Sequence, residues 1–139
     1  MILLDSDVVS TIMRLHLDPL LAHWLRRQSA DQLMTSAPSV FDMRAGIEST
    51  PQGKRRRVLE AAFKHVIVST LGNRIAPLDA AAAEAAGKLR AAQIASGRNV
   101  SVPDSQIAGI AQSLNVPLAT RNSRDFADLG LHLINPWLR

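Results

Sequence analysis

The stretch Met1-Ile2-Leu3-Leu4-Asp5-Ser6-Asp7-Val8-Val9 reads as a short apolar strand that stops at an aspartate and turns at once into a helix. A strand this uniformly apolar is typical of the middle of a parallel sheet, where both faces are covered. Open α/β sheets bind their ligands at the carboxyl ends of such strands. We therefore expect Asp5 to lie at the edge where an α/β protein carries out its chemistry.

The composition narrows the classes of protein to consider. The 139 residues fit a single domain, residues 1–139, and include no cysteine, which excludes disulfides, thiolate zinc sites and cysteine nucleophiles. The net charge of +4 favours a polyanionic partner, although basic proteins without nucleic-acid roles are common. No stretch approaches membrane-spanning length, and the opening apolar run is too short for a signal peptide. We expect a cytoplasmic protein.

Short apolar segments alternate with helical patterns along the rest of the chain. We predict further strands near residues 31–36, 74–78, 115–120 and 132–134. We predict helices near residues 7–15, 19–25, 38–47, 54–69, 80–96 and 104–114, with Asp18 and Asp79 as caps. This alternation indicates an α/β sandwich with a mostly parallel sheet.

Four aspartates do not fit the exposed helix faces that most acidic residues occupy. Asp5 ends the first strand, and Asp42 lies within the apolar stripe of a helix. Asp104 begins a helix, and Asp125 follows the fourth strand. Carboxylates gathered in one strand-end pocket repel one another unless a divalent cation lies between them, and oxygen ligands favour Mg²⁺ or Mn²⁺. Because such a site activates water and stabilises charge on a phosphoryl group, the pattern favours phosphodiester hydrolysis.

Each of these residues also has a purely structural interpretation. Asp5 and Asp104 fit helix caps. Asp42 and Asp7 fit first-turn acids that complement the helix dipole, and Asp125 fits an ordinary loop acid. The chemistry therefore depends on whether the fold brings these side chains together.

Five short motifs follow one another along essentially the whole chain. They are Ile2 to Ser10 (ILLDSDVVS), Thr35 to Asp42 with Gly46, Val102-Pro103-Asp104 with Ile107-Ala108 and Ala111, Leu118 to Phe126 (LATRNSRDF), and Asn135-Pro136-Trp137. Together, in this order and spacing, they resemble the PIN-domain ribonucleases, specifically the VapC/FitB-type toxins of bacterial toxin–antitoxin pairs. Any one motif alone would be weak.

The resemblance implies a three-layer α/β/α PIN-like domain with a short, mostly parallel central sheet of about five strands. It implies a homodimeric endoribonuclease toxin that depends on Mg²⁺ or Mn²⁺. It also implies a cognate VapB/FitA-like antitoxin that blocks the pocket and carries the toxin to operator DNA. By position, Asp5, Asp42 and Asp104 take the places of the metal-binding catalytic acids. The family's fourth acid varies between positions 122 and 125, and since Asn122 is neutral, Asp125 is the candidate.

Two positions depart from the family pattern. The second acid is normally Glu, and Asp42 is one methylene shorter, which is expected to lower metal affinity or rate. The Asn that usually follows the first motif's hydroxyl residue is Asp7 here, which adds negative charge beside Asp5. The candidates to orient ligands or water around the metal are Ser6, Asp7, Ser36, Thr120 and Asn122. The hydroxyls of Ser6, Ser36 and Thr120 also fit ordinary hydrogen bonding at strand ends.

Two surfaces are candidates for partners. Arg121 and Arg124 flank the expected pocket and are candidates for contact with RNA phosphates, more so than the run of cations at 54–57, which also fits a solvated helix face. The N-terminal helices carry more apolar residues than one core stripe needs: Ile12, Leu15, Leu17, Leu20, Leu21 and Trp24. This excess fits either a docking groove for an antitoxin helix or a well-buried helix pair.

Two alternative functions remain open at this stage. The run Asp5-Ser6-Asp7-Val8 also satisfies the first motif of haloacid-dehalogenase phosphohydrolases, with Asp5 as nucleophile and Asp7 as general acid/base. The lysine that such enzymes need is not evident, and the chain is short for that fold. The second alternative is a degenerate PIN domain that binds antitoxin or RNA without efficient cleavage, because Asp42 fails to complete the site.

Overall fold

The computed structural model describes residues 1–14 and 16–138 of the chain. The centre of this part is a sheet of five short strands, β1 (Ile2–Leu4), β2 (Leu33–Ser36), β3 (Ile75–Ala76), β4 (Leu118–Ala119) and β5 (Leu133–Ile134). The strands lie in the order β3-β2-β1-β4-β5, and every neighbouring pair is parallel. The predicted α/β class is confirmed.

Six α-helices of the described residues surround this sheet. They are α1 (Ser6–Ile12), α2 (Pro19–Arg26), α3 (Ala37–Glu48), α4 (Lys54–His65), α5 (Ala80–Ala95) and α6 (Val102–Leu114). The carboxylate of Asp18 accepts a hydrogen bond from the amide of Leu20, and that of Asp79 accepts one from the amide of Ala82. Both caps were predicted from the sequence and are confirmed. None of these helices is long and apolar enough to cross a membrane.

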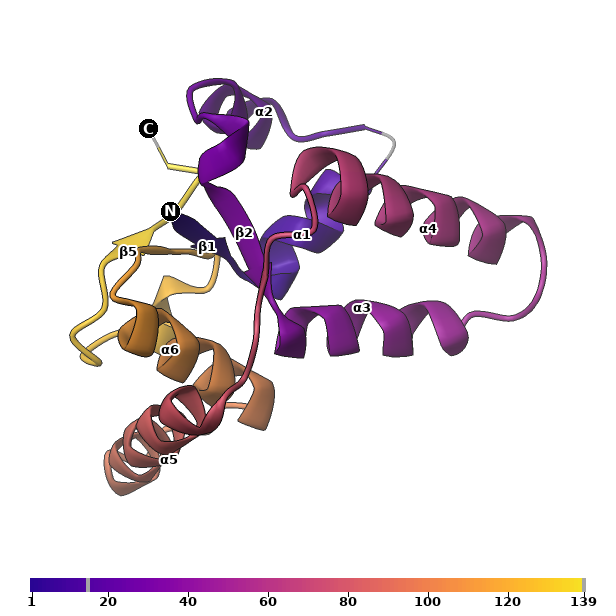
Figure 1. The fold of residues 1–139 in the computed structure, drawn as a ribbon. Coiled ribbons are helices and arrows are strands. Elements are labelled where there is room, and N and C mark those ends of the chain that lie inside the picture. Colours follow the sequence, from indigo (N-terminus) through magenta and orange to yellow (C-terminus); the bar gives the residue numbers. More distant parts are fainter. Residues whose placement is uncertain (15, 139) are drawn as a thin grey trace.

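Two apolar clusters lie on opposite faces of the sheet. Because successive side chains of a strand point to opposite faces, Leu3 packs with buried residues of α5 and α6, whereas Leu4 packs with those of α1 and α2. Leu118 and Ala119 of β4 divide between the same two clusters. Figure 1 shows α5 and α6 together on one side of the sheet, with α1 and α4 on the other. This is the predicted three-layer α/β/α arrangement.

Several predicted boundaries of the strands and of the first helix were wrong. The second strand begins at Leu33 rather than Asp31, because Ala30–Gln32 form a short 3-10 turn. The first helix ends at Ile12, where Met13 is its C-cap, and the predicted end at Leu15 lies outside the described residues. The strands β3, β4 and β5 are shorter than predicted.

Two helix boundaries were also wrong. The helix predicted for residues 54–69 is α-helical only to His65 and continues as a π-helical turn, Val66–Thr70, in which the amide of Leu71 donates to the carbonyl of Val66. The last helix begins at Val102 instead of Asp104, because the Ser101 hydroxyl caps it by accepting from the amide of Asp104. Asp104 therefore lies in the first turn, and its carboxylate is not the cap.

The position of β1 in the middle of the sheet decides which residues meet at its carboxyl edge. Its register pairs Leu4 with Ala119, so the residues that follow, Asp5 and Thr120, lie beside each other. On the other side, β2 ends at Ser36, which starts α3. Segments distant from one another in sequence therefore converge at this edge.

Candidate active site

Asp5 is the most buried acid at this edge, with 4% of its surface exposed. One carboxylate oxygen, Oδ1, accepts from the amide of Ser6 at 2.8 Å, which makes Asp5 the N-cap of α1. The other, Oδ2, accepts from the hydroxyl of Thr120 at 2.8 Å. The cap interpretation and the strand-end interpretation are therefore both correct for this residue.

The environment of Asp5 disfavours its charged form. Burial is the main cause, and the negative charges of Asp7 and Asp104 add to it. The hydrogen bonds from Thr120 and Ser6 act in the opposite direction without offsetting these effects, and the pKa of Asp5 is raised to about 7. Asp5 can therefore hold or release a proton near neutral pH.

Asp7 extends from α1 toward the loop after β4. Its Oδ2 accepts from the backbone amide of Arg121 at 3.1 Å. Its Oδ1 is buried and has no hydrogen-bond partner within the described part of the chain. Burial raises the pKa of Asp7 as well. The first-turn position was predicted, but this link across the sheet edge was not.

Asp104 and Asp125 complete the acidic group from the other side. Burial raises the pKa of Asp104, and the charges of Asp125, Asp42 and Asp7 raise it further. Asp125 lies in a 3-10 turn, Ser123–Phe126, and its carbonyl accepts from the buried side chain of Gln93 at 3.2 Å. Sequence analysis missed Gln93, because nothing in an alanine-rich helix marks one glutamine as buried.

Asp42 reaches the group through serine hydroxyls. Its Oδ2 accepts from the hydroxyl of Ser6 at 3.0 Å, and the Ser6 oxygen also lies 3.0 Å from that of Ser39. Ser39 was not singled out in the sequence, although the spacing of Ser36, Ser39 and Asp42 places all three on one side of a helix. The predicted apolar stripe is only partly correct, since Phe41 is 69% exposed.

The donor set suits a hard divalent cation. The candidate ligands are carboxylate oxygens, they repel one another, and the buried Oδ1 of Asp7 lacks a partner in the described residues. However, no three acidic or histidine side chains within residues 1–14 and 16–138 already stand close enough together to hold an ion. The metal set Asp5, Asp42 and Asp104 stays a prediction.

The other predicted polar residues lie around this group. The Thr120 hydroxyl donates to Asp5 and accepts from the amide of Asn122 at 3.0 Å, so Asn122 contributes its backbone to the site. The guanidinium of Arg121 lies 4.8 Å from the ring centre of Trp137. Arg121 and Arg124 are both exposed, as a contact with RNA requires. In the basic run, Arg56 pairs with Glu48.

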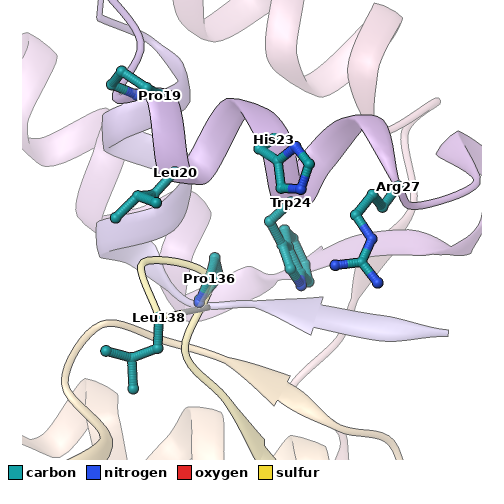
Figure 2. Close-up of a pocket in the computed structure, with 7 residues that line it drawn as sticks. All are labelled: Pro19, Leu20, His23, Trp24, Arg27, Pro136 and Leu138. Atoms are coloured by element: carbon teal, nitrogen blue, oxygen red, sulfur yellow. The ribbon is translucent and has the colours of Figure 1, made fainter.

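The apolar residues of the N-terminal helices divide between the buried core and the lining of a surface hollow. Leu21 is fully buried in the core, and Ile12 and Leu17 pack against it. Leu20 and Trp24, by contrast, line a hollow of about 490 Å³. Figure 2 shows this hollow between α2 and the segment after β5, which supplies Pro136 and Leu138. Leu15 lies outside the described residues, and a docking role for the hollow stays a prediction.

Comparison with known proteins agrees with this geometry. The PIN domain family model matches residues 2–131. The chain is 31% identical over 137 residues to VapC ribonuclease Y4jK of Sinorhizobium fredii, covering 99% of this chain and 98% of that protein. It is 34% identical over 137 residues to plasmid stability protein StbB of Pseudomonas syringae pv. tomato, covering 99% of each.

Solved structures give the same answer for the fold. The structure of FitAB bound to an IR36 DNA fragment contains a chain that matches with a TM-score of 0.88 and 28% sequence identity. The match covers 100% of this chain and 97% of that one. The order of strands, the acidic residues at the carboxyl edge and these likenesses agree, and the chain belongs to the PIN-domain family.

Proposed function

We propose that this protein is an endoribonuclease toxin of a toxin–antitoxin pair, which hydrolyses RNA phosphodiester bonds with Mg²⁺ or Mn²⁺ held by Asp5, Asp42 and Asp104. The observation that carries the proposal is the buried carboxylate of Asp5 at the carboxyl edge, with a pKa raised to about 7 beside two further acids. Carboxylates are kept desolvated and close together where a cation is to be bound. The likeness to a VapC ribonuclease supports RNA as the substrate.

The residues of this protein would have distinct roles in the proposed reaction. The amide of Ser6 and the hydroxyl of Thr120 hold both oxygens of Asp5, so its carboxylate keeps one orientation. A bound divalent ion supplies Lewis-acid chemistry, in which a water nucleophile is activated and charge on the phosphate is offset. Asp125 is the proposed fourth catalytic acid. The guanidinium groups of Arg121 and Arg124, which are both exposed, would bind phosphates of the RNA.

The proposal extends to the partners of the chain. We propose a VapB/FitA-like antitoxin as its inhibitor and a homodimer as its working form. Contact with operator DNA would occur only through the antitoxin. The likeness to FitAB on a DNA fragment supports this assembly.

The direct test is an RNA cleavage assay with the purified full chain, freed of any antitoxin. Total bacterial RNA is incubated with Mg²⁺, Mn²⁺ or EDTA, and with the variants Asp5→Asn and Asp31→Asn. Asp31 is an exposed acid in the 3-10 turn before β2, so Asp31→Asn controls for the loss of one negative charge. Discrete cuts that need metal, disappear in Asp5→Asn and persist in Asp31→Asn are expected. If the folded native chain cleaves no RNA with either metal, the proposed nuclease activity is refuted.

A second candidate is a degenerate PIN domain that binds antitoxin or RNA without efficient cleavage. The lack of three converged ligands among the described residues favours it. The variant Asp42→Glu extends the carboxylate by about 1.5 Å and is expected to raise both the cleavage rate and the metal affinity. Unchanged values for both would show that the length of this side chain does not limit the site. The family match leaves the haloacid-dehalogenase alternative without support.

A further inference from the structure

Three serine hydroxyls form a continuous chain of hydrogen bonds that ends at Asp42. Ser36 lies at the end of β2 and caps α3, because its hydroxyl oxygen accepts from the amide of Ser39 at 3.1 Å. The hydroxyl oxygens of Ser36 and Ser39 are 3.0 Å apart. Those of Ser39 and Ser6 are also 3.0 Å apart, and Ser6 is 3.0 Å from Oδ2 of Asp42. The chain joins β2, α3 and α1.

Counting the hydroxyl protons fixes the direction of these hydrogen bonds. An ionised carboxylate only accepts hydrogen bonds, so the single proton of the Ser6 hydroxyl goes to Asp42. The contact between Ser6 and Ser39 must then use the proton of Ser39. Ser39 in turn accepts from Ser36, whose oxygen is already fixed by the Ser39 amide. Every hydroxyl therefore donates once, toward the carboxylate, and bonds aligned in this way polarise one another.

Because Ser36 and Ser39 are buried, the hydrogen bonds between the serine hydroxyls are costly to break. Ser36 and Ser39 are both 0% exposed, so water cannot replace a missing hydroxyl there. A buried polar atom left without a partner carries a desolvation penalty that an exposed one avoids. Among the described residues no hydrogen bond joins the side chains of Ser39 and Asp42, and the Ser39 hydroxyl is linked to the carboxylate through Ser6. Its position between the hydroxyls of Ser36 and Ser6 points to a role in orienting them.

We propose that Ser39 is a positioning residue, which acts through Ser6 to hold the Asp42 carboxylate in the orientation that binds the divalent cation. This inference rests on the proposed function, because it assigns Asp42 a ligand's role. We call the series of hydrogen bonds from Ser36 through Ser39 and Ser6 to Asp42 the relay. Because the side chain of Asp42 is short, its carboxylate has less reach and depends more on its exact rotamer, which makes the relay more important. Ser36 donates the first hydrogen bond of the relay to Ser39, and Ser6 donates the last one to Asp42.

The test measures binding of Mn²⁺ alone to the full chain by isothermal titration calorimetry. Ser39→Ala is expected to weaken Mn²⁺ binding about tenfold, the usual effect of removing a group that orients a metal ligand. Ser39→Thr keeps a hydroxyl and is expected to restore most of the affinity. Thr35→Val is the matched control, because it removes a hydroxyl that is 1% exposed and bonded to the Leu4 carbonyl instead of the relay. It should leave the affinity unchanged.

A double-mutant cycle separates positioning from a general loss of structure. In the Asp42→Ala background the relay has no carboxylate to orient, so adding Ser39→Ala should change Mn²⁺ affinity no further. A structural defect would weaken binding equally in both backgrounds, which would overturn the proposal, as would native affinity in Ser39→Ala. If Ser39→Ala does not fold, Ser6→Ala breaks the last link at a half-buried position and must give the same loss.

The same titration distinguishes failure of this inference from failure of the proposed function. If the native chain binds Mn²⁺ and Asp5→Asn does not, but Ser39→Ala binds like the native chain, only the relay is refuted. If the native chain binds no Mn²⁺, or if Asp5→Asn binds it as well as the native chain, the metal site is refuted and the role of Ser39 with it.

Discussion

Replacing Asp5 with asparagine should stabilise the metal-free protein above neutral pH and not below about pH 4. The pKa of Asp5 is about 7 in the folded chain, against 3.8 for an ordinary aspartate. Between these values the folded chain holds a proton that the unfolded chain has released. The free energy of unfolding of the native sequence therefore falls as pH rises through this window. The asparagine side chain cannot ionise, so the variant escapes this loss.

The size of the effect follows from the same interval. At about 1.4 kcal/mol per pH unit, the interval from 3.8 to about 7 corresponds to at most about 4 kcal/mol. Asparagine retains an oxygen to accept from the Ser6 amide, but its other side-chain atom must rearrange its hydrogen bond with Thr120, at a cost of about 1–2 kcal/mol. We expect the variant to be more stable by about 2 kcal/mol near pH 8 and less stable by about 1 kcal/mol near pH 4.

The assay is urea unfolding of both proteins in EDTA at several pH values between about 4 and 8.5. Comparing the two proteins cancels the titration of the shared groups that do not interact with Asp5. A stability difference that stays constant over this range would refute the reasoning, because it would mean that Asp5 ionises normally in the folded chain. Replacing EDTA with Mn²⁺ should raise the stability of the native protein and leave Asp5→Asn almost unchanged.

Two further pairs of substitutions test the packing and the substrate surface. A Cβ built on Gly109 would lie 2.5 Å from both Cβ and the backbone nitrogen of Ala86, so Gly109→Ala should lower the free energy of unfolding by about 1–3 kcal/mol in urea unfolding. Gly87→Ala, with open space around it in helix α5, should raise stability by up to about 1 kcal/mol, and a loss there would contradict the packing of α5 on α6. In filter binding of RNA to the Asp5→Asn chain, which is expected not to cleave RNA, Arg121→Ala and Arg124→Ala should each weaken binding and reduce its salt dependence by about one counterion. An unchanged salt slope in both would exclude them as phosphate contacts.

Local signals account for what could be predicted from the sequence. Asp18 and Asp79 were recognisable as caps because a cap depends on amides two or three residues away. The alternation of strands and helices was recognisable because each element carries its own periodicity. The predicted start of α6 failed because Ser101, which was not considered as a cap, lies three residues before the predicted cap Asp104 and caps the helix instead.

The sequence by itself determined the α/β class, the parallel sheet and the position of Asp5 at the end of its central strand. The family motifs could also be recognised from the sequence, because they are short local patterns that do not depend on which residues are neighbours in space. Only the tertiary structure decided that Thr120 holds Asp5 across 115 residues of sequence, and that Asp7 bonds the amide of Arg121. It alone revealed Ser39 between Ser36 and Ser6. Desolvation and side-chain contacts depend on which surfaces pack together, and no local pattern carries that information.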